Sequence, residues 1–201
     1  MNENAARADR KADTARPQPA GWRRLLRSRD GAAAIEFAIL AIPYFLIVFA
    51  IIETFVAFTG EQLVVNAVDT MSRKLRTGQI TADNTDATKF RIAFCDEISI
   101  LIRCNEDEED KLMLDLRSFP TFADIPTTIP REGGERFGSI DSSDFDYAPG
   151  GPGSINMLRA YYRWSIITDL VRPYISTIRP ADGSIPSEFL IVATAAYQNE
   201  P

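Results

Sequence analysis

The chain of 201 residues contains no histidine, and its 28 acidic side chains outnumber its 22 lysines and arginines, which gives a formal net charge of −6. The absence of histidine removes the side chain that proteins use most often for acid–base catalysis, for activating nucleophiles and for binding metals. An acidic balance without a basic domain argues against a nucleic-acid partner. We therefore expect an assembled component rather than an enzyme, with no cofactor and no nucleic acid bound.

Positive charge is concentrated at the N-terminus. Residues 1–30 contain eight lysines and arginines and four acidic residues, a net charge of +4. The rest of the chain contains 14 lysines and arginines and 24 acidic residues, a net charge of −10. The first 20 residues have no apolar period, and their composition predicts disorder. Because cytoplasmic segments beside a membrane helix are rich in lysine and arginine, the basic tail is predicted to lie in the cytoplasm and the rest of the chain across the membrane.

An apolar run of 21 residues, Ala32–Ile52, follows the basic tail. As an α-helix it would be about 32 Å long, close to the ~30 Å thickness of the hydrocarbon core of a bilayer. It predicts a single N-terminal membrane helix, with the buried helix of a soluble protein as the alternative. A cleaved signal peptide fits poorly. Signal peptides have an apolar core of about 7–15 residues followed by a small-residue cleavage site, whereas this run is longer and no such site follows it closely. Pro43, in mid-run, favours a kink but is also tolerated in membrane helices.

Three features of this run occur together in one family: the segment Gly31-Ala-Ala-Ala-Ile-Glu36-Phe37-Ala38, then Pro43, then Ile51-Ile-Glu53. In these features the chain resembles the N-terminus of TadE-like proteins. These are pseudopilins, or minor pilin-like proteins, of the tight-adherence (Flp) branch of type IV pili. The C-terminal Asn199-Glu200-Pro201 is similar to the segment with which this family often ends.

The resemblance implies a processing site. Type IV prepilins have a basic leader that ends in glycine, and a glutamate lies five residues beyond that glycine. By this pattern a prepilin peptidase would cut between Gly31 and Ala32, and Glu36 would be the fifth residue of the mature chain. The major pilins of the branch usually have tyrosine after the glutamate, whereas this chain has Phe37, as TadE-like members often do.

Glu36 is a charged residue inside the apolar run. A charged side chain in hydrocarbon costs about 2.5–3.5 kcal/mol even on lenient insertion scales. After cleavage, the new α-amine of Ala32 would be cationic near neutral pH, and the Glu36 of a neighbouring subunit, about one turn deeper, could pair with it. This pair would offset the cost and set the axial register between subunits. The alternatives are that the carboxyl is protonated or that it reaches the cytoplasmic interface.

The membrane helix is predicted to continue outward, past Gly60, and to end at Thr77-Gly78 after about 45 residues. Its outer half has one apolar stripe, which should pack on the following domain: Leu63, Val64, Ala67, Val68, Met71 and Leu75. Glu53 is expected at the far interface, solvated by water and without a chemical role. A second helix is predicted over 83–103, with Asp83 or Thr85 as its cap.

Cys95 and Cys104 are the only cysteines. The chain beyond the membrane lies on the oxidising side, so a disulfide is favoured. The spacing requires the chain to turn back after about Ile102, and a loop of this size gives roughly 2–3 kcal/mol of stability. A catalytic cysteine is the alternative, but it would need a base and the chain has no histidine. Two cysteines cannot make a structural zinc site alone.

Three further clusters have weak functional signals. The five carboxylates of 106–110 predict a solvated turn, with a docking patch for a basic partner as the alternative. Asp141, Asp144 and Asp146 lack the spacing of a calcium-binding EF-hand. The glycine cluster 150–153 lacks the lysine and the serine or threonine of a phosphate-binding loop, and is expected to be a turn.

Three segments have strand character: Leu112–Arg117 alternates, Met157–Ile167 is rich in aromatic and β-branched residues, and Glu188–Tyr197 is mostly apolar. A short helix is expected near 174–178. The long connection 119–154, which contains five prolines, is expected to be a surface binding feature or partly disordered.

These elements predict an α+β, pilin-like fold. A long N-terminal transmembrane helix continues into a small periplasmic domain with a second helix and a three- to four-stranded antiparallel sheet. The predicted divisions are a cytoplasmic basic leader at 1–31, the transmembrane helix at 32–59 and the α+β domain at 60–201.

The function that follows from the resemblance is that of a TadE-like component of tight-adherence pilus assembly, which associates through its N-terminal helix. The expected location is the bacterial inner membrane, with the N-terminus cytoplasmic and the C-terminal domain periplasmic. The expected partners are other pilin or pseudopilin subunits, inner-membrane pilus assembly proteins, a prepilin peptidase and membrane lipid, with the driving energy supplied by a separate ATPase. The alternative is a single-pass, membrane-anchored periplasmic binding or scaffold module that is not part of a filament.

Overall fold

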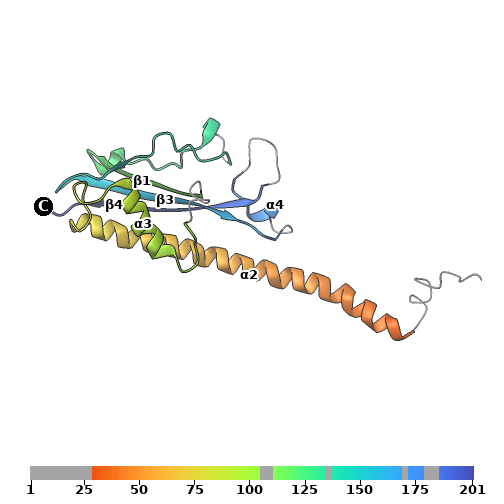
Figure 1. Cartoon of the computed structure of the whole chain (residues 1–201). Helices are drawn as coiled ribbons and strands as arrows, with labels where there is room; N and C mark the ends of the chain where they lie inside the picture. The colour runs from red at the N-terminus through yellow and green to blue at the C-terminus, as the bar shows by residue number, and fades with distance from the viewer. Residues whose placement is uncertain (1–28, 105–110, 135–136, 169–171, 179–185) are drawn as a thin grey trace, which may run out of the picture. The chain divides into compact units, whose positions relative to one another are not determined.

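The computed structural model describes residues 29–104, 111–134, 137–168, 172–178 and 186–201. It has an α+β fold, as predicted: a long helix α2 (Arg29–Arg76), a second helix α3 (Ala87–Ile98), a short helix α4 (Arg172–Ile175) and a four-stranded sheet (Figure 1). The chain divides into two compact units, residues 1–45 and 46–201, so that α2 contributes to both. The acidic run at 106–110 lies outside the described residues.

Helix α2 runs for 48 residues and ends close to the predicted position. After Arg76, the backbone N–H of Thr77 bonds to the carbonyl of Arg73 at 3.0 Å, and the N–H of Gly78 bonds to that of Leu75 at 3.1 Å. Gly78 has a φ of +71°, a left-handed conformation that is unstrained only for glycine. The Thr-Gly pair therefore terminates the helix, as the sequence predicted.

The outer half of α2 packs on the sheet through one stripe. The buried members of the stripe recur every three or four residues, which puts them on one helical face: Val64, Ala67, Val68, Met71 and Leu75. Burial of each of the larger side chains in this stripe stabilises the fold by about 1.5–3 kcal/mol. The periodicity in the sequence thus identified the face correctly.

Gly60 allows α2 to approach the sheet closely. A Cβ atom built on Gly60 would lie 2.6 Å from Cζ3 of Trp164, and real Cβ atoms do not come so near. The indole therefore packs directly on the helix backbone. In the sequence, Gly60 was the one weak point of the predicted helix. In the structure, the absence of a side chain at Gly60 leaves room for the indole ring of Trp164.

Helix α3 is shorter than predicted, and its cap is a different residue. Asp86 is the N-cap, and its carboxylate accepts the N–H of Lys89 at 2.8 Å; the expected caps, Asp83 and Thr85, were wrong. The segment before it forms a separate turn, in which the Asn84 side chain accepts the N–H of Thr81 at 2.9 Å. The helix ends at Ile98 because the chain then turns back toward the disulfide.

The sheet consists of β1 (Leu112–Phe119), β2 (Tyr147–Ala148), β3 (Ile155–Ser165) and β4 (Glu188–Gln198), in the order β2-β1-β3-β4. β1, β3 and β4 pair antiparallel, but β2 runs parallel to β1, with Leu116 opposite Tyr147. The sheet is therefore mixed, and the prediction of an antiparallel sheet was wrong. Parallel neighbours need a long connection, and residues 120–146 provide one.

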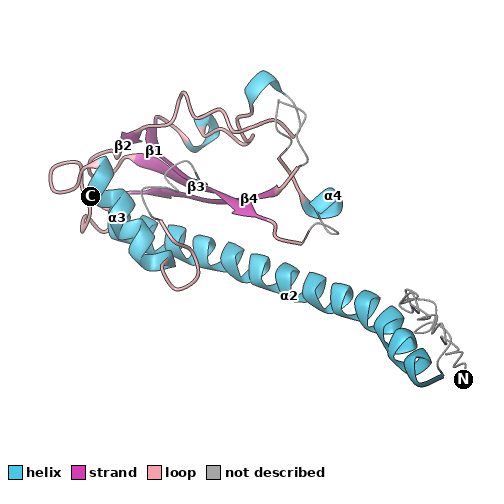
Figure 2. Cartoon of the chain, turned by 45° about the vertical axis from the view of Figure 1, so that its right-hand side comes forward, coloured by secondary structure: helices cyan, strands magenta, loops and turns pink. Residues whose placement is uncertain are grey.

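This long connection covers the face of the sheet opposite α2 (Figure 2). Phe145 stacks on Tyr161 with ring centroids 4.9 Å apart, and Ile140 is buried against the same face. The buried guanidinium of Arg159 donates to the carbonyls of Pro126 at 2.6 Å and Thr128 at 3.2 Å. The described part of the connection is therefore a third layer of the domain.

The contact between Gly60 and Trp164 can be tested by Gly60→Val. Valine is a better helix former than glycine, but its side chain has no room against the indole. We expect a loss of about 1–3 kcal/mol of unfolding free energy, as for other overpacked sites. The measurement is thermal unfolding of the full chain in detergent micelles, followed by tryptophan fluorescence.

Asn66→Val is the matched control, because Asn66 is an exposed position of the same helix. It should leave the melting temperature almost unchanged. If Gly60→Val were as stable as this control, the close packing would not contribute to the fold.

Candidate functional site: the apolar helix and its two carboxylates

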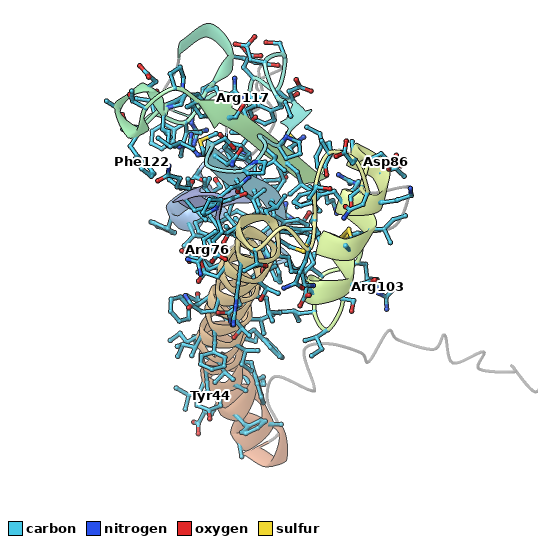
Figure 3. All side chains as sticks on the ribbon, turned by 90° about the vertical axis from the view of Figure 1, so that its left-hand side faces the viewer. Tyr44, Arg76, Asp86, Arg103, Arg117 and Phe122 are labelled. Atoms are coloured by element: carbon cyan, nitrogen blue, oxygen red, sulfur yellow. A yellow bond between two sulfur atoms is a disulfide. The ribbon has the colours of Figure 1, made fainter. Side chains whose placement is uncertain are left out.

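The inner half of α2 exposes a continuous apolar surface. Large apolar side chains are exposed along it: Ile35, Phe37, Ile39, Leu40, Ile42, Tyr44, Phe45, Leu46, Ile47, Phe49, Ile51, Ile52, Phe55 and Phe58. In Figure 3, the side chains around Tyr44 project outward all round the ribbon. Exposed apolar patches of this kind mark interaction surfaces. Among the described residues, α2 is the one helix long and apolar enough to cross a membrane, and its most apolar window is not buried.

The residues predicted from the resemblance lie at the beginning of this helix. Gly31 and Ala32 belong to its first turns. Glu36 and Phe37 are both exposed, with the carboxylate surrounded by the apolar surface. Pro43 lies inside α2, which continues on both sides of it. Cleavage after Gly31, the role of Glu36 in register and the kink at Pro43 remain predictions.

Glu53 has a role that the sequence did not reveal. Its carboxylate accepts the backbone N–H of Ile167 at Oε1, and that of Thr168 at 3.2 Å from Oε1 and 2.9 Å from Oε2. The side chain is half-buried, and was expected to be solvated by water. Hydrogen bonds to a charged group stabilise by about 1.5–3 kcal/mol. Glu53 therefore ties α2 to the turn that follows β3, a partner more than 100 residues away that no local pattern indicates.

The disulfide between Cys95 and Cys104 is confirmed (Figure 3). Their Cα atoms are 5.8 Å apart, and both side chains pack against the core cluster that contains Phe90 and Ile98. The backbone N–H of Ile102 bonds back to the carbonyl of Ile98 at 3.0 Å, so the turn that the cysteine spacing requires begins after Ile98, earlier than the predicted position after about Ile102. Among the described residues no cysteine is free, which leaves none to act as a nucleophile.

Asp141 and Asp146, two of the three aspartates at 141–146 in the long connection, have hydrogen-bond partners there. The Asp141 carboxylate accepts the hydroxyl of Ser143 at 2.6 Å, which lowers the pKa of Asp141, and the Asp146 carboxylate accepts the N–H of Tyr147 at 2.7 Å. The described residues contain no group of three or more histidine, cysteine, aspartate or glutamate side chains placed to hold a metal ion. These carboxylates fix turns in the chain.

The C-terminal segment Asn199–Pro201 joins β4 to the glycine turn and to the end of α2. The Asn199 side chain donates to the carbonyl of Gly150 at 2.8 Å and to that of Gly151 at 3.0 Å. The N–H of Glu200 bonds to the carbonyl of Arg76, at the end of α2, at 3.0 Å. Burial raises the pKa of the neighbouring Tyr197 phenol. This end of the chain therefore closes the domain over the last turn of α2.

The fold and the exposed surface define a class: α+β proteins built on one long N-terminal helix that could span a membrane. Within this class, residues 31–73 match the family model described as TadE-like protein, which confirms the resemblance seen in the sequence. The match covers most of α2 and leaves the sheet outside it. The comparisons with curated proteins and with solved structures find no significant match.

The tie between Glu53 and the turn after β3 can be tested by Glu53→Ala. The variant removes both acceptor oxygens, so the amides of Ile167 and Thr168 should exchange with solvent faster, and the unfolding free energy should fall by about 1.5–3 kcal/mol. Hydrogen–deuterium exchange of the full chain in detergent micelles reports the amides, and thermal unfolding reports the stability.

Glu53→Gln should have a smaller effect, since it keeps one neutral acceptor. Glu61→Gln, on the same helix, is the control and should change neither quantity. Unchanged exchange at Ile167 and Thr168 in Glu53→Ala would show that the carboxylate does not hold this turn.

Proposed function

We propose that this chain is a pseudopilin-like or minor pilin-like component of tight-adherence (Flp) pilus assembly. In this proposal α2 anchors the chain in the bacterial inner membrane, with the N-terminus in the cytoplasm and the sheet domain in the periplasm. The observation that carries the proposal is the exposed apolar surface from Ile35 to Phe58, interrupted near its start by Glu36. The match of residues 31–73 to the TadE-like model supports it.

The two halves of α2 suit this arrangement. A helix that is apolar all round requires lipid or other helices around it, whereas a helix with one apolar stripe lies at a protein surface. The inner half of α2 exposes apolar side chains over most of its surface. The outer half has one apolar stripe and exposes Asn66, Asp69 and Arg73 to solvent. The inner half can therefore lie in the bilayer and contact other subunits, while the outer half supports the sheet domain.

Glu36 would direct the contact between helices. If a prepilin peptidase removes residues 1–31, the α-amine of Ala32 lies about 6 Å along the helix from Glu36, at 1.5 Å per residue. A carboxylate and an amine from neighbouring subunits would each offset the desolvation of the other. The pair would then favour a stagger of about one turn between adjacent helices. The pilin and pseudopilin subunits, the assembly proteins, the peptidase and the lipid are all partners within this proposal, which assigns no catalytic activity to the chain.

Processing gives the first test of the proposal. Protein purified from membranes of cells that contain a prepilin peptidase should begin at Ala32, because the basic leader ends at Gly31. Intact mass spectrometry should find this species, and Gly31→Leu should prevent its formation. A chain that keeps Met1 to Gly31 in these cells would contradict the proposed processing.

Subunit association gives the second test. Glu36→Gln and Glu36→Leu should both insert into the membrane as the unaltered protein does, since each removes a charge from the apolar run. Both should reduce crosslinking between subunits and pilus formation severalfold, because each removes the partner of the Ala32 amine. Glu61→Gln is the matched control.

An anchored binding or scaffold module would give a different result. Membrane insertion would be normal, and neither Glu36 variant would change crosslinking or piliation. That outcome would replace the pilin-like proposal with the alternative.

A further inference from the structure

The apolar surface of α2 continues beyond Glu53. Phe55 and Phe58 are both exposed, and Phe58 lies about 7–8 Å farther along the helix than Glu53, at 1.5 Å per residue. A carboxylate at Glu53 therefore lies within the apolar part of the helix rather than after its end. If α2 spans a membrane, Glu53 is at or below the level where the hydrocarbon meets the headgroups.

The turn after β3 comes down to this level. Glu53 accepts the backbone N–H groups of Ile167 and Thr168. Backbone N–H groups and carboxylates away from water need hydrogen-bond partners, and here each satisfies the other. The turn can thus approach the bilayer without leaving these polar groups unpaired.

Two large apolar or aromatic side chains at this end of the domain are exposed in the part of the chain that the structure describes. Ile167 is 84% exposed and Tyr174, on α4, is 85% exposed. The Arg172 side chain donates to the carbonyl of Ile166 at 3.1 Å, which holds α4 against the turn. Both Figure 1 and Figure 2 place α4 at the end of the sheet where β3 ends and β4 begins. Placing an isoleucine in an apolar environment is favourable by about 1.5–3 kcal/mol, and tyrosine is enriched at membrane interfaces.

The charged side chains that the structure describes near this turn have partners within the domain. Arg163 and Glu188 form an ion pair at 2.6 Å between β3 and β4, and Arg172 is bonded within the domain. Charged groups at this level would lie among the polar headgroups.

We propose that Ile167 and Tyr174 form a membrane lip, a part of the sheet domain that inserts into the outer boundary of the bilayer in which α2 is anchored. The lip rests on the membrane span of the proposed function and adds a second lipid contact outside the helix. With Glu53 holding the turn to α2, the lip fixes the depth of the helix and keeps the sheet domain against the bilayer surface.

The experiment places a spin label at single introduced cysteines in the full chain. Because Cys95 and Cys104 are joined, Ile167→Cys and Tyr174→Cys can be labelled selectively. The protein is reconstituted in vesicles of phosphatidylethanolamine and phosphatidylglycerol, and each label's collisions with oxygen, which enters lipid, are compared with those of a water-soluble nickel chelate.

Ile100→Cys is the matched control, because Ile100 is also isoleucine and is 88% exposed. It lies near Glu97, which pairs with Lys74 at 2.7 Å, and Lys74 is about 31 Å along α2 from Glu53 at 1.5 Å per residue. Ile47→Cys, in the apolar part of α2, reports the membrane span itself.

The labels at 167 and 174 should have an oxygen-to-nickel collision ratio severalfold higher than the label at 100. If the labels at 167 and 174 had the same ratio as the label at 100 while the label at 47 was exposed to lipid, the proposed lip would be wrong. The proposed membrane span would not be affected by this result. Protection from both reagents at 167 would show that protein covers the site, which also overturns the lip. A water-exposed label at 47 would contradict the proposed span.

Discussion

The structure depends on one constraint: the inner half of α2 has an apolar surface that the described part of the chain does not cover. Large apolar side chains from Ile35 to Phe58 are exposed, and burial of such surface is the dominant favourable term in folding and association. In the proposed function, lipid or other helices cover this surface. The main packing between the sheet domain and α2 is made by the outer half of the helix, through the stripe from Val64 to Leu75.

Two contacts join the sheet domain to α2 close to the C-terminal end of the uncovered surface. Gly60 lets the Trp164 ring lie on the helix backbone, and Glu53 binds the amides of Ile167 and Thr168. Both contacts involve the last part of β3 or the turn after it. The end of β3 is thus fixed against α2 from two sides, and the position of the domain along the helix follows from these few residues.

Local patterns in the sequence were sufficient to predict α2, three of the four strands, the buried stripe and the disulfide. The period of 3.6 identified Val68 and Met71 as core, and the cysteine spacing required a turn, which begins after Ile98 and not after about Ile102 as predicted. The parallel strand β2 and the partners of Glu53 were not predictable, because they depend on contacts between segments far apart in the chain. The cap of α3 was misplaced because several polar residues, Asp83, Thr85 and Asp86, precede it.

The central claim is that a membrane separates the basic N-terminus from a sheet domain in an oxidising compartment. Its most direct test uses the two cysteines as reporters in living cells. Free thiols are blocked with an alkylating reagent before lysis, and mass spectrometry of the unreduced protein then counts the blocked groups. The account predicts that neither Cys95 nor Cys104 is alkylated, because both form the disulfide. Alkylation of both cysteines in protein from its native membrane would place the sheet domain in the reducing cytoplasm and contradict the account.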